Sequence, residues 1–184
     1  MEPREGPTVA HWVGSRVIVF DPEQGSALYS RGFFGLPLGI RKPKRFEFDR
    51  PLELSLCETR YLMEKGEITL KDLASGDTVP LEEFVDRARQ VDSRFDARYD
   101  VYADLRDKGK VVRSGLKFGA DFAVYRKGPG IDHSPYIVQV MERDSHITSV
   151  DMVRAGRLAT SVKKRFVIAN PTTKTYYAFR WIRP

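Results

Sequence analysis

The run of residues 136–141 (YIVQVM) constrains the fold of this chain more than any other stretch. It is nearly all apolar, and an apolar run of this length is typical of a strand in a sheet that is covered on both faces. Strand-like segments surround it, and a helix-like segment follows it; these lie at residues 110–113, 116–125, 149–164, 165–169 and 175–182. The order of three strands, one helix and two strands predicts a mixed sheet with flanking helices.

The first half of the chain has shorter and more polar segments. Residues 8–20 and 26–38 indicate short strands with Gly-containing connections. Residues 53–64 and 81–91 have the apolar spacing of helices, and the second of these follows Pro80. A break at residues 92–93 precedes a further helical stripe, which ends at Gly109. The stripe is formed by Phe95, Tyr99, Tyr102 and Leu105.

These segments predict an α/β (α+β) fold in two parts. We expect a small N-terminal domain of mixed β-sheet and helix at residues 1–90. A C-terminal domain with a central mixed sheet and flanking helices should occupy residues 91–184. The shift in charge between the two halves is the main reason for placing the boundary there.

The positive charge of the chain is concentrated in its second half. Residues 1–92 hold 13 Lys and Arg against 16 Asp and Glu, and residues 93–184 hold 18 against 9. The net charges are therefore −3 and +9. A strongly basic domain favours a polyanionic partner such as a nucleic acid, although many basic domains bind none.

Several other classes of protein are excluded or disfavoured. No apolar run reaches the ~18 residues of a membrane helix, and the first 20 residues lack the apolar core of a secretory signal. A single cysteine, Cys57, excludes an intramolecular disulfide framework and a multi-cysteine metal site, and it is expected in the core. We expect a cytoplasmic protein without a membrane partner.

Basic residues recur along one side of the helix predicted at 149–164. Arg154, Arg157, Ser161 and Lys164 follow helical spacing, with Met152, Val153, Leu158, Ala159 and Val162 expected on the buried side. Arg157 and Lys164 would lie roughly 10 Å apart along the axis, a spacing that suits neighbouring nucleotides. A solvated basic face is the alternative interpretation.

The three histidines lie in unrelated segments, so they do not indicate a zinc site. His11 is expected to be structural and His146 to be exposed in a polar turn. His133 differs, because it lies in the Gly- and Pro-containing loop at residues 126–135, just after the strand that ends at Tyr125. It is a candidate catalytic group, with an ordinary surface histidine as the alternative.

Three ordered motifs give the chain a resemblance to a known family. They are residues 115–125 (GLKFGADFAVY), His133 with the strand at 136–140, and residues 156–164 (GRLATSVKK). Together they resemble the catalytic domain of the tRNA-splicing endonucleases, or tRNA-intron lyases. The N-terminal half matches more loosely, through the helix start at 54–58, and the chain length resembles that of the short archaeal subunits.

The resemblance implies cleavage of precursor tRNA without a metal ion or other cofactor, giving 2′,3′-cyclic phosphate and 5′-hydroxyl ends. The family uses a tyrosine, a histidine and a lysine, which fall here on Tyr125, His133 and Lys164. Lys164 matches better than Lys163, because one residue then separates it from the apolar strand that follows.

The chemistry of RNA explains why such a triad suffices. RNA carries its own nucleophile, the 2′-hydroxyl, so no metal-bound water is needed. A phenol of ordinary pKa, near ~10, needs nearby positive charge to take the proton, and Lys164, Arg126 and Lys127 are candidates for that charge. The imidazole of His133 can protonate the departing 5′-oxygen. The ammonium of Lys164 can neutralise the charge that builds up on the phosphorane.

The resemblance also implies residues that hold the RNA. Family members grip a bulged base between cationic or aromatic side chains, and the matching positions are Arg157 and Trp181, with Arg180 or Arg183 as alternatives to Trp181. Packing within a strand is the alternative for Trp181. Lys44, in the basic loop at residues 41–45, could add a contact to the RNA backbone, or the loop could simply aid solubility.

Assembly is a further implication of the resemblance. In the family, an acidic loop between the last two strands plugs a basic groove on a neighbouring subunit. The corresponding residues 170–175 (NPTTKT) contain no acid. This departure predicts a heterotetramer of α2β2 type, in which a non-catalytic paralogous subunit supplies the acidic loop.

Two other functions stay open on the sequence alone. A metal-dependent nuclease would need clustered carboxylates; Asp121 and Glu142 are available, but Gln139 stands where a further acid would help. A non-catalytic RNA-binding subunit is the second alternative, although all three residue types of the triad are present.

Overall fold

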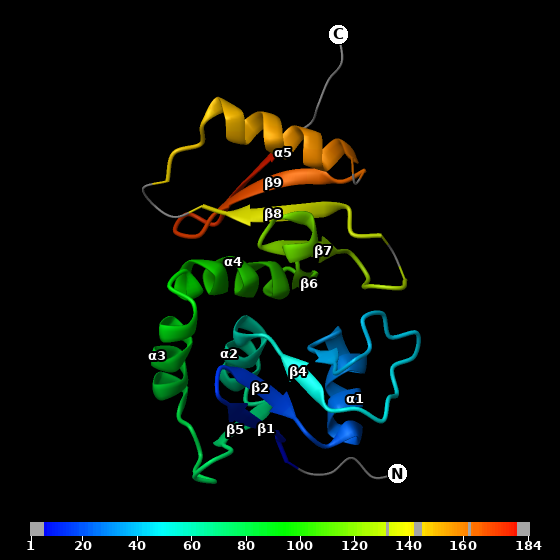
Figure 1. Cartoon of the computed structure of the whole chain (residues 1–184), viewed down its shortest axis with the longest axis vertical. Coiled ribbons are helices and arrows are strands. Elements are labelled where there is room, and N and C mark those ends of the chain that lie inside the picture. The colour runs from blue at the N-terminus through cyan, green and yellow to red at the C-terminus, as the bar shows by residue number, and fades with distance from the viewer. Residues whose placement is uncertain (1–5, 132, 142–144, 162, 180–184) are drawn as a thin grey trace. The chain divides into compact units, whose positions relative to one another are not determined.

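The computed structural model describes residues 6–131, 133–141, 145–161 and 163–179. The chain divides into two compact units, Met1–Phe95 and Asp96–Pro184 (Figure 1). The sequence placed the boundary at residue 90, and that position stays a prediction. None of the helices in the described ranges combines the length and the apolar character that spanning a bilayer requires.

The first unit is built on a five-stranded mixed sheet of order β3-β4-β2-β1-β5. Only β1 and β5 run parallel. The strands are β1 (Thr8–Val13), β2 (Arg16–Val19), β3 (Leu36–Pro37), β4 (Leu52–Leu54) and β5 (Ile68–Asp72), and the helices are α1 (Pro22–Gly32), α2 (Leu56–Glu64) and α3 (Leu81–Val91). The helices expected near 53–64 and at 81–91 are therefore present, the first of them after a short strand.

Helix α1 contradicts the strand predicted at residues 26–38. Asp21 caps this helix, because its side chain accepts hydrogen bonds from the backbone of Glu23 and Gln24. Pro22 occupies the first turn, where its fixed φ favours a helix. The apolar residues that suggested a strand, Leu28 and Tyr29, are the buried side of this helix.

The second unit contains a five-stranded mixed sheet of order β10-β9-β8-β7-β6. Its elements are α4 (Phe95–Asp107), β6 (Val111–Ser114), the 3₁₀ turn η1 (Leu116–Phe118), β7 (Phe122–Tyr125), β8 (Tyr136–Val140), α5 (Ser149–Ser161), β9 (Arg165–Asn170) and β10 (Thr175–Phe179). Strands β8 and β9 are parallel and are joined through α5, while the other neighbours are antiparallel. The predicted fold class is thereby confirmed.

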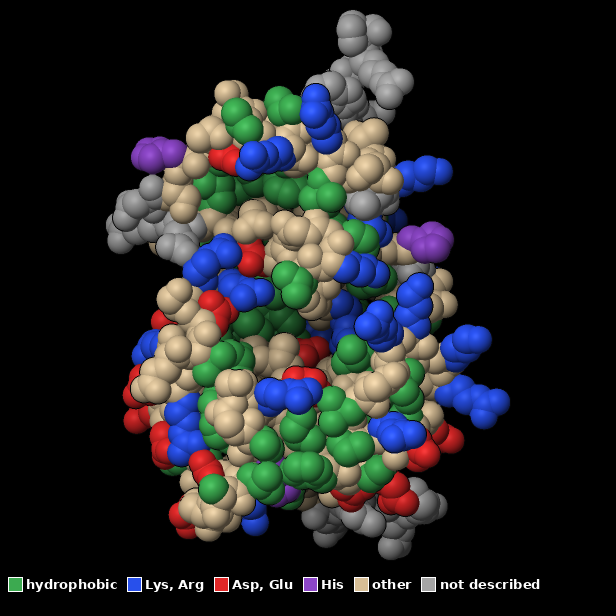
Figure 2. All heavy atoms as spheres, viewed as in Figure 1, with side chains coloured by type: hydrophobic (Ala, Val, Ile, Leu, Met, Phe, Trp, Pro, Cys, Tyr) green, Lys and Arg blue, Asp and Glu red, His purple; other side chains and the backbone are tan. Residues whose placement is uncertain are grey.

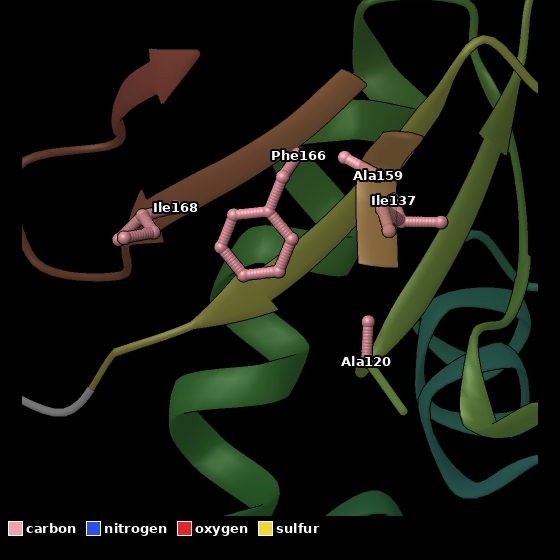
Figure 3. Close-up of a cluster of buried hydrophobic side chains, with 5 residues drawn as sticks. All are labelled: Ala120, Ile137, Ala159, Phe166 and Ile168. Carbon is pink, nitrogen blue, oxygen red and sulfur yellow. The ribbon is translucent and has the colours of Figure 1, made fainter. Parts of the chain in front are cut away.

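Helices α4 and α5 cover opposite faces of this sheet (Figure 1). On one face, Tyr102 of α4 contacts the ring of Phe122. On the other, Ala159 of α5 lies in a buried cluster with Ile137 and Phe166, which also includes Ala120 and Ile168 (Figure 3). The two-sided cover explains why β8 is so apolar, since Ile137 is 0% exposed and Val138 2%.

Helix α5 is less buried than the sequence predicted. Met152 and Val153 are 42% and 41% exposed, whereas Ala159 is buried. The helix starts with a reciprocal cap, in which Asp151 N donates to Thr148 Oγ1 and Thr148 N donates to Asp151 Oδ2. Its last turn lies on the sheet while its first turns remain open to solvent. The side chain of Val162, also expected to be buried, is outside the described residues.

The turn η1 replaces the first part of the strand predicted at 116–125. Gly115 lies so close to the start of β7 that an added Cβ would be 2.7 Å from the carbonyl carbon of Phe122. Gly119 closes the turn with a left-handed φ of 65°. These two glycines let residues 116–118 form a turn between β6 and β7 instead of a strand.

Candidate active site

The strand register places Tyr125 and Lys164 in one row across the second sheet. Val124 pairs with Tyr136, and Tyr136 pairs with Arg165. The next row is Tyr125, Pro135 and Lys164, because Pro135 directly precedes β8 and Lys164 directly precedes β9. Arg165 N donates to Pro135 O at 2.9 Å, so the pairing holds at this step.

This row belongs to the face of the sheet that α5 covers. Side chains alternate along a strand, so Tyr125 lies on the same face as Ala123, which pairs with Ile137 of the buried cluster. Tyr125 and Lys164 are separated by two strand spacings, or roughly 10 Å between Cα atoms. A phenol and a lysine side chain can meet across that distance.

The side chain of Lys164 is anchored to the segment that leads into β8. Its Nζ donates to Ser134 O at 2.5 Å and lies 5.1 Å from the ring centroid of Phe118. Burial lowers the pKa of Lys164, and the nearby Lys117 ammonium lowers it further. The ammonium is thus partly withdrawn from water but retains donors that can bind an anion.

His133 precedes Ser134, the residue whose carbonyl group holds Lys164. Its side chain is exposed, while Ser134 is 2% exposed and donates through Oγ to Tyr136 O. The buried serine fixes the end of the loop and leaves the imidazole next to it open to solvent. The structure therefore brings the His133 segment to Lys164 and puts Tyr125 in the same row.

Two of the residues expected to bind RNA, Arg157 and Lys44, are among those that the structure describes. Arg157 is exposed on α5, and Lys44 is exposed in the basic loop of the first unit. Trp181 and Arg180 lie outside the described residues, as does Arg183. On the face shown in Figure 2, acidic side chains lie mainly over residues 1–95 and are few over the second unit. This distribution follows the charge difference between the two halves of the chain.

Three residues around Lys164 had no role in the sequence-based interpretation. They are Lys117 and Phe118 of η1 and Ser134 of the loop. The motif at 115–125 contains the first two, but a strand was predicted there, so neither was expected to face Lys164. No signal in the sequence pointed to Ser134, because it acts through its main-chain carbonyl.

Asp121, one of the two carboxylates considered for a metal site, is buried and bonded to neighbouring residues. It is 7% exposed, and its Oδ2 accepts from Val140 N at 2.8 Å and from Gln139 Nε2 at 2.7 Å. Its Oδ1 lies 3.2 Å from Arg98 Nε. Among the described residues, no three His, Cys, Asp or Glu side chains cluster in a way that could hold a metal ion. Glu142 is outside these residues.

Both units match models of one protein family. Residues 95–177 match the tRNA intron endonuclease catalytic C-terminal domain, and residues 9–85 match the tRNA intron endonuclease N-terminal domain. The chain belongs to the tRNA intron endonuclease family. The match to the catalytic domain includes Tyr125, His133 and Lys164.

Relatives of similar length support the same assignment to the tRNA intron endonucleases. The chain is 47% identical to a tRNA-splicing endonuclease of Hyperthermus butylicus, over 94% of this chain and 97% of the relative. It is 43% identical to that of Saccharolobus solfataricus and 42% identical to one from Saccharolobus islandicus, each over 93% of this chain and 96% of the relative. The similarity therefore spans both units, including the N-terminal one that matched loosely by motif.

Proposed function

We propose that this chain cleaves precursor tRNA at intron splice sites without a metal ion or cofactor. The cut leaves a 2′,3′-cyclic phosphate on one fragment and a 5′-hydroxyl on the other. The observation that carries the proposal is the row of Tyr125, Pro135 and Lys164, with His133 two residues from its centre. This row supports a site in which a phenol, an imidazole and an ammonium act at one end of one sheet.

Each group has one step in the reaction. Tyr125, as phenolate, takes the proton of the 2′-hydroxyl, and the 2′-oxygen forms a bond to the adjacent phosphorus. The bond from phosphorus to the 5′-oxygen breaks, and His133 gives its proton to that oxygen. Lys164 stays charged and stabilises the extra negative charge on the non-bridging oxygens. The same charge favours the phenolate form of Tyr125.

Recognition of the substrate is assigned to exposed basic and aromatic residues. Arg157 on α5 is exposed and suits stacking on an unpaired base. Trp181, with Arg180, is proposed for the other side of that base. Lys44 is proposed to contact the RNA backbone. The substrate is a bulge–helix–bulge in precursor tRNA, because its bulges expose bases that paired RNA hides.

Chelation is the sharpest test of the proposed chemistry. The purified enzyme should cut an intron-containing precursor tRNA at the same rate in EDTA as in Mg²⁺, and the upstream fragment should carry a cyclic phosphate. Tyr125→Phe should lose cleavage in both buffers, because the base is missing. Loss of cleavage in EDTA that Mg²⁺ restores would favour the metal-dependent nuclease. Specific RNA binding without any cleavage would favour a non-catalytic subunit.

A mixed assembly is proposed for the active enzyme. The turn between β9 and β10 is closed by Asn170, whose Oδ1 accepts from Thr172 N and Thr173 N, and residues 170–175 contain no acid. A paralogous subunit with an acidic loop would complete an α2β2 heterotetramer. Native mass spectrometry should show this chain reaching a tetramer only with such a partner. An active homotetramer of this chain alone would contradict the mixed assembly and leave the chemistry unaffected.

A further inference from the structure

Two ammonium groups face one aromatic ring at the candidate site. The Nζ of Lys117 lies 4.6 Å from the ring centroid of Phe118, and the Nζ of Lys164 lies 5.1 Å from the same centroid. Phe118 itself packs against the buried cluster around Ile137, so its position is fixed by the core. Both ammonium groups therefore lie beside one ring on the α5 face of the sheet.

The charges at this place are not balanced within the described part of the protein. Among the described residues, no carboxylate forms an ion pair with either Lys117 or Lys164. The two ammonium groups repel each other, and this repulsion contributes to the lowered pKa of Lys164. Two neighbouring positive charges attract an anion, and a bound anion would relieve their repulsion.

We propose that Lys117 is a second catalytic lysine, which binds the non-bridging oxygens of the scissile phosphate together with Lys164. This inference rests on the proposed function, because it needs the phosphate to lie at Lys164. The phosphate carries one negative charge before the reaction and gains a second in the phosphorane. Two ammonium groups neutralise that second charge better than one.

The local structure favours such a role for Lys117. Lys164 uses one of its three N–H donors on Ser134 O, which leaves two for the substrate. Lys117 is exposed on η1, so its ammonium is free to reach a bound phosphate. Gly115 and Gly119 frame η1, and the absence of a Cβ at Gly115 lets this turn lie close to β7. Gly115 N donates to Asp121 O at 2.9 Å and fixes the turn there.

The test compares Lys117→Met with the matched variant Lys65→Met. Lys65 is also exposed and lies 5.2 Å from the ring centroid of Tyr61, so the two variants remove the same charge from the same kind of contact. Lys117→Met should lower the single-turnover cleavage rate about 10–100-fold. Its affinity for a precursor that carries 2′-deoxynucleotides at both cleavage sites should change less than about threefold. Lys65→Met should alter neither quantity.

Chemical rescue separates the charge from the packing of η1. Lys117→Cys should be as slow as Lys117→Met, and alkylation with 2-bromoethylamine, which attaches an aminoethyl group to the thiolate and releases bromide, should restore most of the rate. The only other cysteine, Cys57, is buried. A wild-type rate in Lys117→Met, or a loss of rate that alkylation does not restore, would overturn the role of Lys117. An inactive wild-type enzyme would instead overturn the proposed function.

Discussion

Lys164→Met is expected to lower the single-turnover cleavage rate by about 10³-fold, with little change in RNA affinity. Lys164 lies in one row with Tyr125, and its Nζ donates to Ser134 O. Under the proposed mechanism, its loss removes charge stabilisation at the scissile phosphate. The measurement is cleavage of saturating amounts of precursor tRNA, together with binding of the 2′-deoxy precursor. A structural role alone would predict a lower unfolding midpoint without this loss of rate.

Lys163→Met is the matched control for Lys164→Met, because both variants remove one charge from adjacent residues. Lys163 is exposed and has a left-handed φ of 52°. Its variant should cleave within about twofold of the wild-type rate, as expected for an exposed charge. If Lys163→Met is the slower of the two, the assignment of the active lysine is wrong.

The lowered pKa of Lys164 makes its expected contribution to the cleavage rate depend on pH. Burial and Lys117 lower its pKa, so its charge is lost at a lower pH than that of an exposed lysine. The contribution of Lys164 to the rate should therefore decline early on the alkaline side. Lys164→Arg keeps its charge at every practical pH, and its rate relative to wild type should rise as the pH increases.

His133→Ala is expected to slow cleavage by about 10²–10⁴-fold, because the departing 5′-oxygen then has no proton donor. A precursor with sulfur in place of that 5′-oxygen tests the role directly. A thiolate leaves without a proton, so His133→Ala and wild type should cleave the sulfur substrate at similar rates. The exposure of His133 makes the substitution tolerable for the fold.

The sulfur substrate can also disprove the role of His133 as proton donor. If His133→Ala stays slow with sulfur as the leaving atom, the imidazole binds or orients the RNA instead. Lys164→Met should remain slow on both substrates, since it stabilises charge on the non-bridging oxygens. The two variants thus serve as controls for each other.

Much of the second unit could be predicted because its apolar pattern is strong. The run at 136–141 indicated a doubly covered strand, and β8 is that strand. Residues 26–38 were misassigned because Leu28 and Tyr29 suit a buried strand as well as a buried helix face. The cap at Asp21, before Pro22, was the signal that decides for a helix.

The candidate site was only partly predictable. Tyr125, His133 and Lys164 were identified from motifs, but the row that Tyr125 shares with Lys164 depends on the pairing of β7 with β8 and of β8 with β9. Strands β8 and β9 are almost 30 residues apart in sequence. Spacing along the chain carries no information about the register between them. The exposure of Met152 and Val153 was missed for a related reason, since helical periodicity does not tell how much of a helix the sheet reaches.

The position of Lys164 in the site depends on the register in which β9 pairs with β8, and a shift of one residue would remove it from the site. Because side chains alternate, a slip of β9 by a single residue would turn Lys164 to the α4 face and bring Arg165 into its place. Substitutions at exposed positions of α5, such as Met152 and Val153, should leave this alignment intact. A one-residue deletion in the last turn of α5, by contrast, would abolish cleavage even in a protein that still folds.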